Sequence, residues 1–377
     1  MIELKEVTKL YKGQVAPAVD RLSLTIEKGE TCTFLGPSGC GKSTTLRMIN
    51  RMIEPSSGTI RINGKDVKEE DPNKLRMGIG YVIQQIGLLP HRTVAENIAI
   101  VPRLYGWPKE KINERVDELL RLIGLDPEMT RNKYPSQLSG GQMQRIGVAR
   151  AMAVDPPVML MDEPFGAVDP IARNYLQDEF LRLQKEMKKT ICFVTHDINE
   201  AIKMGDKIAI FNQGKLVQHG TPQEILTRPA NDFVRDFIGY DRVVKKLSLF
   251  QVKELTRRHM CIASYAELAD ICRKMNDAKA EVCFITNAAG EWDGFITAAE
   301  IANKEKLTGK SVSPEKVQAM ALNQKQAVVQ ETFLLRDALS LMLELNTDYL
   351  GVFDRNEPVG MITLSDIRQH SSRKGGE

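Results

Sequence analysis

One eight-residue segment constrains this chain more than any other, because it fits the pattern G-x-x-x-x-G-K-[ST]. It consists of Gly36, Pro37, Ser38, Gly39, Cys40, Gly41, Lys42 and Ser43. An apolar run at residues 32–35 precedes it, and a run typical of a helix follows at residues 44–50. This order predicts a strand, a tight loop and a helix whose first turn binds anions through backbone N–H groups. The alternative is a glycine-rich turn that binds nothing.

The side chains of this segment have defined roles if it is a phosphate loop. Lys42 is expected to reach the β- and γ-phosphates of a nucleoside triphosphate, and Ser43 to ligate Mg²⁺ beside Thr44 at the helix start. Cys40 lies among backbone amides and beside Lys42, a setting that favours the thiolate. We therefore expect a nucleotide-binding ATPase in which Cys40 is an alkylatable thiol that bound ATP shields.

Two later segments narrow the class of ATPase. One begins with Leu138 and continues with Ser139, Gly140, Gly141 and Gln142; the other is an apolar run, residues 158–161, that ends in Asp162 and Glu163. Alone, the first is most often a loop or a helix start, and an acid after a strand often caps the next element. In this order and with the phosphate loop, they resemble the ATPases of ATP-binding cassette (ABC) transporters over residues 1–236.

The resemblance implies an α/β fold, a P-loop nucleotide-binding domain with a helical subdomain, and roles for three residues. Asp162 would hold Mg²⁺, and Glu163 would act as the general base for the water that attacks the γ-phosphate. His196, which follows an apolar run, would hydrogen-bond the γ-phosphate; the alternative is a histidine satisfied within the core.

Two further assignments come from the resemblance. Gln84 would contact Mg²⁺ and the attacking water, although Gln85 is adjacent and the assignment can shift by one residue. Tyr11 would stack on adenine, or it is one more core or surface tyrosine.

The segment Ser139, Gly140, Gly141 and Gln142 opens a predicted helix, so its amides and the Ser139 hydroxyl form an anion site. The resemblance implies that the phosphate bound there belongs to a second subunit. Two copies would form a head-to-tail homodimer with two ATP molecules sandwiched between them, and Asp169 would cross the interface.

Composition agrees with a globular protein of two or three domains. The chain has 377 residues, of which 42% are apolar and 27% charged. A net charge of +3 is too small to indicate a nucleic-acid partner. The six cysteines show no metal-ligand spacing, and no stretch resembles a membrane span or signal peptide, so we expect a cytoplasmic location.

The sequence changes character after residue 236. Residues 241–258 carry six Lys or Arg against two acids, so we interpret residues 237–258 as a basic linker. The commoner explanation of such a charge excess is a solvated basic face; the alternative is attraction to anionic lipid at a membrane surface. An internal repeat at an offset of 66 to 67 residues follows, in segments 259–310 and 316–372.

Both repeats end in a similar pattern, Gly-x-x-Thr-x-x-acid-Ile, at residues 294–301 and 360–367. This resembles tandem cystathionine-β-synthase-type (CBS) domains, which often bind adenosine-containing ligands, here an adenine nucleotide or cyclic di-AMP. The resemblance implies that Thr363 and Asp366 contact ribose or phosphate oxygens. The first repeat has Glu300 instead of aspartate, which puts that half-site in doubt. The alternative is a purely structural pair.

A CBS pair behind the ATPase resembles the ATP-binding subunits of bacterial importers for quaternary amines such as glycine betaine, carnitine or choline. The implied partners are a transmembrane permease, whose coupling helix would meet residues 85–107, and indirectly a solute-binding protein. The chain would then work at the cytoplasmic face of the membrane. Alternatives are an importer for methionine or polyamines with a structural CBS pair, a cassette ATPase of translation or DNA repair, and a pure adenylate sensor.

Overall fold

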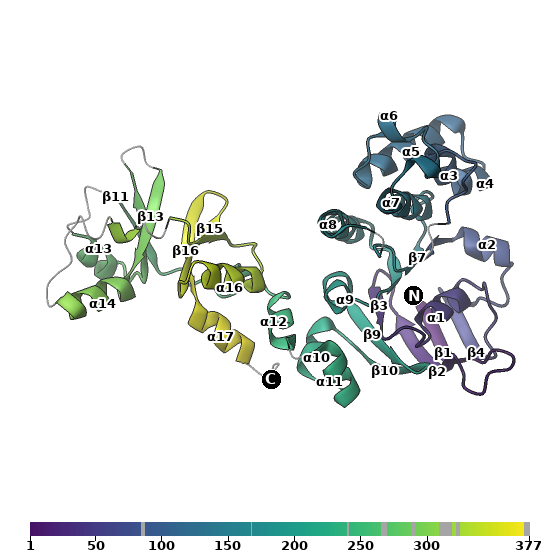
Figure 1. Ribbon diagram of the computed structural model, residues 1–377, viewed down its shortest axis with the longest axis horizontal. Helices are drawn as coiled ribbons and strands as arrows, with labels where there is room; N and C mark the ends of the chain where they lie inside the picture. The colour runs from purple at the N-terminus through teal and green to yellow at the C-terminus, as the bar shows by residue number, and fades with distance from the viewer. Residues whose placement is uncertain are drawn as a thin grey trace. The chain divides into compact units, whose positions relative to one another are not determined.

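The computed structural model describes residues 1–83, 87–166, 168–239, 241–264, 270–287, 291–308, 319–321 and 325–372. The chain forms two compact units, Met1–Gly239 and Tyr240–Glu377. Figure 1 shows a mixed sheet-and-helix architecture in each unit. Among the described residues, no helix is both long and apolar enough to span a bilayer.

A six-stranded sheet forms the centre of the first unit, in the order β10-β9-β3-β8-β7-β6. All its neighbouring pairs are parallel except β10 with β9. Every residue of β3, β7 and β8 is buried, as expected for parallel strands covered on both faces. The strands are β3 (Thr31–Leu35), β6 (Ile79–Val82), β7 (Val158–Asp162), β8 (Thr190–Val194), β9 (Lys207–Asn212) and β10 (Lys215–Gly220).

An antiparallel sheet, in the order β2-β1-β4-β5, belongs to the same unit. Its strands are β1 (Ile2–Lys9), β2 (Val19–Ile26), β4 (Ser57–Ile62) and β5 (Lys65–Asp66). Helix α1 (Lys42–Ile49) follows the phosphate loop and buries Leu46 and Met48 completely in a core that takes residues from both sheets. Packing on two sheets fixes the direction in which α1 leaves the loop.

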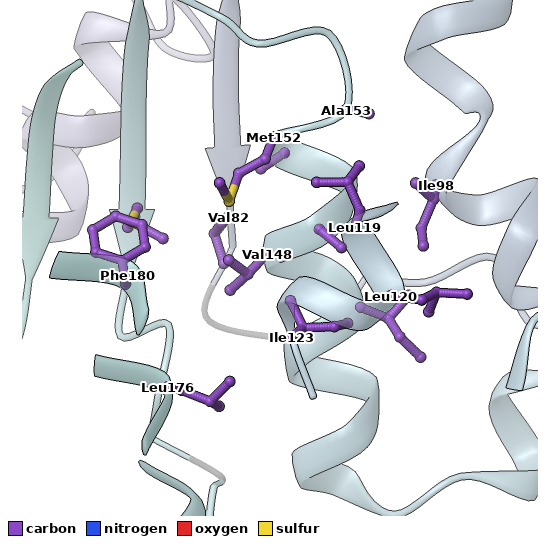
Figure 2. Packing of buried hydrophobic residues seen from close by; sticks show 14 of the residues in the cluster. Val82, Ile98, Leu119, Leu120, Ile123, Val148, Met152, Ala153, Leu176 and Phe180 are labelled. Carbon is purple, nitrogen blue, oxygen red and sulfur yellow. The ribbon is translucent and has the colours of Figure 1, made fainter. Parts of the chain in front are cut away.

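A helical subdomain lies between β6 and β7 in the sequence, and Figure 1 shows its helices gathered away from the antiparallel sheet. Leu119 and Leu120 of α5 belong to one buried cluster with Val148 of α7 and with Met152, the residue that follows α7, and Figure 2 shows these side chains. The helices are α3 (Val94–Ile98), α4 (Ile100–Leu104), α5 (Lys109–Leu122), α6 (Pro127–Thr130), the 3₁₀ turn η1 (Pro135–Gln137) and α7 (Gly140–Ala151). The predicted helical subdomain is therefore confirmed.

The remaining helices of this unit mostly begin at side-chain caps. Asp169 and Asp197 accept hydrogen bonds from amides in the first turns of α8 and α9, which supplies partners for donors that a helix start leaves free. These helices are α2 (Pro72–Met77), α8 (Pro170–Met187), α9 (Ile198–Met204), α10 (Pro222–Thr227) and α11 (Asp232–Ile238).

The second unit contains the predicted repeat. Its two three-stranded sheets, β11-β12-β13 and β14-β15-β16, share one topology, a parallel pair followed by an antiparallel pair. The elements are α12 (Arg242–Leu247), η2 (Val252–Glu254), β11 (Met260–Ser264), α13 (Ile271–Asp277), β12 (Val282–Thr286), β13 (Trp292–Thr297), α14 (Ala298–Thr308), β14 (Val328–Gln330), α16 (Leu335–Glu344), β15 (Tyr349–Asp354), β16 (Glu357–Thr363) and α17 (Leu364–Ser372).

The two repeats share one aromatic core. Phe284 and Phe295 of the first repeat contact Phe353 and Tyr349 of the second, with ring centroids 5.4 Å apart for Phe284–Phe353 and 6.2 Å for Phe295–Tyr349. A Cβ on Gly351 would approach the Phe284 ring to 3.1 Å, so the second repeat supplies space for the first. The repeats are therefore halves of one structural unit.

The predicted linker differs from the structure. The boundary between the units lies at residues 239 and 240, and residues 242–258 belong to the second unit. Leu247 and Val252 are 1% and 0% exposed within its core. The Val252 amide donates to the Phe333 carbonyl at 2.8 Å. The sequence shows the basic residues of this segment but not the apolar contacts that hold it in the fold.

Loss of the Phe284 ring should destabilise the second unit strongly. Phe284 is fully buried, so Phe284→Ala is expected to cost about 3–5 kcal/mol of unfolding free energy. Urea denaturation followed by Trp292 fluorescence in a Trp107→Phe background measures this unit, because the chain has only two tryptophans. The matched control is Phe333→Ala, whose ring is 43% exposed. Equal shifts for both variants would contradict the shared aromatic core.

Candidate functional site

The loops that carry the predicted site follow three neighbouring parallel strands. β3, β8 and β7 lie side by side, and they lead into the phosphate loop, His196 and Glu163 respectively. Parallel strands end at the same edge of a sheet, which is where open α/β sheets bind ligands. The fold thus brings together segments that are distant in the sequence.

Two glycines of the phosphate loop occupy positions that no other residue fits. Gly36 has φ +150°, and a Cβ built on it would lie 2.3 Å from the Phe211 carbonyl oxygen. Gly41 has φ +106°, and its Cβ would lie 2.5 Å from the carbonyl oxygen of Ala18. Side chains there would collide with fixed backbone. The loop residues that face solvent or lie partly exposed are Pro37, Ser38, Gly39, Ser43 and Thr44.

The ammonium group of Lys42 lies inside the loop. Its Nζ donates to the carbonyl oxygens of Gly36 at 2.7 Å and Pro37 at 2.9 Å, and the residue is 6% exposed. The loop therefore encloses a positive charge, the group that a phosphate loop uses to neutralise phosphate. Contact with the β- and γ-phosphates stays a prediction.

The expectation of an accessible thiol at Cys40 is wrong. Cys40 is 3% exposed, and its side chain packs in the core cluster that includes Phe211. Its Sγ lies 3.6 Å from Lys42 Nζ. The sequence places Cys40 among loop amides, but it does not show that the side chain turns inward, away from reagents in solvent.

Ser43 and Asp162 are joined directly. The Ser43 hydroxyl donates to Asp162 Oδ1 at 2.8 Å, and Asp162 is 2% exposed. Burial raises the pKa of Asp162, while the hydrogen bond from Ser43 and the nearby Arg47 and Lys42 act in the opposite direction. Two hard oxygen donors from different elements thus lie within one hydrogen bond of each other, a donor set that fits Mg²⁺.

Glu163 and His196 form the second contact of this edge. His196 Nδ1 lies 3.2 Å from Glu163 Oε1, and their side chains are 65% and 24% exposed. The carboxylate is therefore partly open to solvent, as a residue that activates water must be. The two predicted catalytic residues lie together, and their roles stay predictions.

Sequence reasoning missed Gln144, which contacts the backbone of Glu163. Gln144 lies in α7 and is 4% exposed, and its Nε2 donates to the Glu163 carbonyl oxygen at 2.8 Å. A usable signal was present: Gln144 is a long polar residue on the helix side that otherwise buries Gly147, Val148 and Ala151.

The other predicted contacts of ATP are less complete. Tyr11 is half-buried just beyond β1, and the Lys9 ammonium lies 5.2 Å from its ring centroid. Its role in stacking on adenine stays a prediction. The Gln84 assignment, with its alternative Gln85, falls outside the described residues.

The segment Ser139–Gln142, called the signature segment below, caps its own helix. The Ser139 hydroxyl accepts from the Gln142 amide at 3.2 Å, and the Gln142 side chain accepts from the Ser139 amide at 3.0 Å. Gly140 is exposed at the first position of α7, so the helix start faces solvent. In the part of the chain that the structure describes, no hydrogen bond joins this segment to the phosphate loop. Asp169 is likewise exposed, and its Oδ1 accepts from the Ala172 amide at 3.0 Å.

In the second unit, Asp366 is already engaged. Its Oδ2 accepts from the Thr363 hydroxyl at 2.6 Å, and Arg257 Nη2 donates to its Oδ1 at 2.7 Å. Arg257 also donates to Glu281 of the first repeat at 2.9 Å. Burial opposes ionisation of Asp366, but the bonds from Arg257 and Thr363 prevail and hold its pKa below the usual value. Sequence reasoning missed this contact of Arg257, which lies 109 residues away from Asp366.

The first repeat has the same local geometry with a longer acid. Glu300 Oε2 accepts from the Thr297 hydroxyl at 3.0 Å, as Asp366 accepts from Thr363. Tyr349 of the second repeat reaches this pair, and burial, then its hydrogen bond to Glu300, raises the tyrosine's pKa. The acid partner of each closing threonine is thus in contact with a side chain from elsewhere in the unit.

Comparisons with known proteins agree with this geometry. A family model described as ABC transporter matches residues 19–166, and one described as CBS domain matches residues 322–373. The dimeric structure of MJ0796, a bacterial ABC transporter cassette, is similar with a TM-score of 0.55 at 35% identity, covering 59% of this chain and 98% of that one. A post-hydrolysis structure of MJ0796 bound to ADP and Pi gives the same values.

Relatives extend over nearly the whole chain. The osmoprotectant import ATP-binding protein OsmV of Salmonella typhimurium is 44% identical over 94% of this chain and 92% of its own. The carnitine transport ATP-binding protein OpuCA of Listeria monocytogenes is 46% identical over 97% and 91%. The glycine betaine/carnitine/choline transport ATP-binding protein OpuCA of Bacillus subtilis is 43% identical over 97% and 95%. The chain therefore belongs to the ABC transporter family, as an ATP-binding subunit that hydrolyses ATP and carries CBS repeats behind its ATPase unit.

Proposed function

We propose that this protein powers the import of an osmoprotectant such as glycine betaine, carnitine or choline through a membrane ABC transporter. The observation that carries the proposal is the similarity to osmoprotectant subunits across both units of the chain. An importer of methionine or polyamines accounts for the ATPase unit alone and leaves the CBS repeats without a role. The solute itself is chosen by the permease and by a solute-binding protein.

The ATP site works through residues at the carboxyl edge of β3, β7 and β8. Residues 36–44 bind the phosphates through loop amides and Lys42, and Ser43 and Asp162 hold Mg²⁺. The metal, when bound, would neutralise phosphate charge as the γ-phosphoryl group passes from ADP, the leaving group, to the attacking water. Glu163 takes the proton of the attacking water, and His196, 3.2 Å from Glu163, donates to the γ-phosphate.

Hydrolysis requires two copies of the chain in a head-to-tail homodimer. The exposed start of α7 offers amides of Ser139–Gln142 to the phosphate of the partner's ATP. Asp169 lies exposed at the start of α8, where it can cross the same interface. The dimeric MJ0796 cassette supports this arrangement by similarity.

The permease contacts the helical subdomain on the cytoplasmic side of the membrane. A surface groove of about 540 Å³ lies there, with Arg103, Trp107 and Ile112 among its lining residues. Residues 87–107 of the predicted coupling segment are described and lead into this groove. Apolar side chains line this groove together with three basic residues and one acid, Glu96, a mixture that fits a short amphipathic helix of a membrane subunit.

The CBS repeats regulate transport by binding a phosphate-bearing adenine ligand, an adenine nucleotide or cyclic di-AMP. A ligand that takes Asp366 as its ribose contact displaces Arg257 from a bidentate ion pair. The freed guanidinium then needs another acceptor, and a phosphate provides one. This geometry favours nucleotides over nucleosides at the Thr363–Asp366 half-site.

Glu163→Gln is expected to keep ATP binding and nearly abolish turnover, because the amide preserves shape and cannot accept the proton. General-base catalysis is worth about 10²–10⁴-fold, so the barrier should rise by roughly 3–5 kcal/mol. The assay is ATP hydrolysis and uptake of labelled glycine betaine, carnitine and choline by the reconstituted importer. Near-normal hydrolysis would remove Glu163 from its role, and uptake of none of the three solutes by the unmodified importer would refute the substrate class.

Removal of residues 240–377 should leave an ATPase that no longer responds to regulation. The cut follows the unit boundary, because a cut at residue 259 would strand Leu247 and Val252 without their core. Hydrolysis by the truncated importer is expected to stay within about twofold, while its response to ionic strength or to cyclic di-AMP disappears. An unchanged response would leave the repeats with a structural role.

Asp366→Asn should weaken binding of AMP or cyclic di-AMP to the full-length chain. Loss of a hydrogen bond to a charged group costs about 1.5–3 kcal/mol, which corresponds to roughly 10- to 150-fold. Calorimetry measures it, with Asp337→Asn as control, since Asp337 is half-exposed and pairs with its sequence neighbour Arg336. Equal affinities in the two variants would exclude Asp366 as a ligand contact.

A further inference from the structure

Gln144 is a buried amide in the helix that the signature segment begins. It follows Ser139 by five residues in α7 and is 4% exposed. A buried carboxamide is unfavourable unless its polar atoms find partners. Its Nε2 donates to the carbonyl oxygen of Glu163 at 2.8 Å, so the signature helix is bonded to the backbone of the proposed general base.

That backbone needs support. Glu163 has φ +50°, a left-handed conformation that costs a residue other than glycine about 1–3 kcal/mol and persists only where the surroundings hold it. Its amide donates to the Val194 carbonyl at 3.0 Å, and its carbonyl accepts from Gly166 N at 3.2 Å as well as from Gln144. Three contacts, from β8, from the following turn and from α7, therefore fix the backbone of Glu163 and with it the direction in which its side chain points.

We propose that Gln144 is a positioning residue that couples the signature helix to the general base. The inference rests on the proposed roles of Glu163 and of Ser139–Gln142. A helix rises about 1.5 Å per residue, so the amide lies only about 7.5 Å along α7 from the phosphate-facing cap. A phosphate bound at that cap belongs to the partner's ATP, whereas Glu163 acts on the ATP of its own subunit. Gln144 thus links the two ATP sites of the dimer.

The link makes hydrolysis depend on occupancy of both sites. When the partner's phosphate holds the start of α7, Gln144 holds the Glu163 peptide in its left-handed conformation and the carboxylate toward His196. When it does not, α7 and the peptide bonded to it are free to shift together. Coupling of this kind is a difference in free energy between two arrangements, and removal of the bond should weaken it.

The test uses Gln144→Met in the full importer, because methionine keeps the length of glutamine and lacks the donor. We expect kcat to fall about 10- to 100-fold, or about 1.4–2.7 kcal/mol at 1.36 kcal/mol per tenfold. The affinity for ATP should change less than twofold, and the Hill coefficient of hydrolysis should approach one. ATP affinity and the melting temperature also report whether the variant is folded.

Gln184→Met is the matched control. Gln184 Nε2 donates to the carbonyl oxygens of Gly29 and Lys189 at 3.2 and 2.6 Å, at the opposite edge of the sheet. Its loss should lower the melting temperature and leave kcat and the Hill coefficient unchanged. If Gln184→Met reproduces the changes seen in Gln144→Met, the effect is one of general stability and the inference is overturned.

A double-mutant cycle separates positioning from packing. If Gln144 acts through Glu163, single-turnover hydrolysis in a Glu163→Gln background should lose little more when Gln144→Met is added. Fully multiplicative losses would overturn the inference, as would unchanged kcat in Gln144→Met. The cycle can be interpreted only if Glu163→Gln alone strongly slows hydrolysis. Near-normal hydrolysis by Glu163→Gln would therefore refute both the base assignment and this inference. Inactive Glu163→Gln with normal Gln144→Met refutes only the inference.

Discussion

The parallel order of β3, β8 and β7 is the constraint on which the ATP site depends. Three fully buried strands point their carboxyl ends the same way, so the loops that leave them meet at one edge. The hydrogen bond between Ser43 and Asp162 joins residues 119 positions apart in the sequence. It forms because β3, which leads into the phosphate loop and α1, ends at the same edge of the sheet as β7. The contact between His196 and Glu163 needs β7 and β8 to be neighbours. A change in strand order would leave every motif intact in the sequence and disconnect all of them.

Rigid surroundings allow this edge to hold an unfavourable backbone. The left-handed conformation of Glu163 is stable because β8 and α7 each form a hydrogen bond with its backbone. Both elements contribute side chains to one buried cluster, part of which Figure 2 shows. Side chains such as Val148 and Met152 therefore contribute to the site indirectly, by fixing α7. The helical subdomain is therefore both the proposed surface for other subunits and a support for Glu163, the proposed base.

The sequence predicted what depends on local pattern and missed what depends on side-chain direction. The phosphate loop needs glycines at positions 36 and 41 for steric reasons, and a sequence motif shows such glycines without a structure. The internal repeat could also be recognised in the sequence, because the closing threonine and the closing acid recur at a fixed offset. Cys40 was misjudged because burial depends on Phe211, a residue of another strand. Gln144 was missed because a motif shows which residues are present and not which atoms of the backbone they reach.

The same limit explains the linker. Net charge marks residues 241–258 as basic, and charge alone suits a solvated segment. In the structure Arg257 instead joins the two repeats, because its guanidinium bonds to Asp366 in one and Glu281 in the other. The Arg257 backbone also forms an isolated antiparallel bridge with Met361 of β16, which ties the segment to the sheet of the second repeat. The closing threonine–acid pairs of the two repeats are consequently unequal: Arg257 engages the acid of the second repeat, whereas Tyr349 engages Glu300 of the first. The two repeats, similar in their closing sequence pattern, thus differ in chemistry through Arg257 and Tyr349, which both lie outside that pattern.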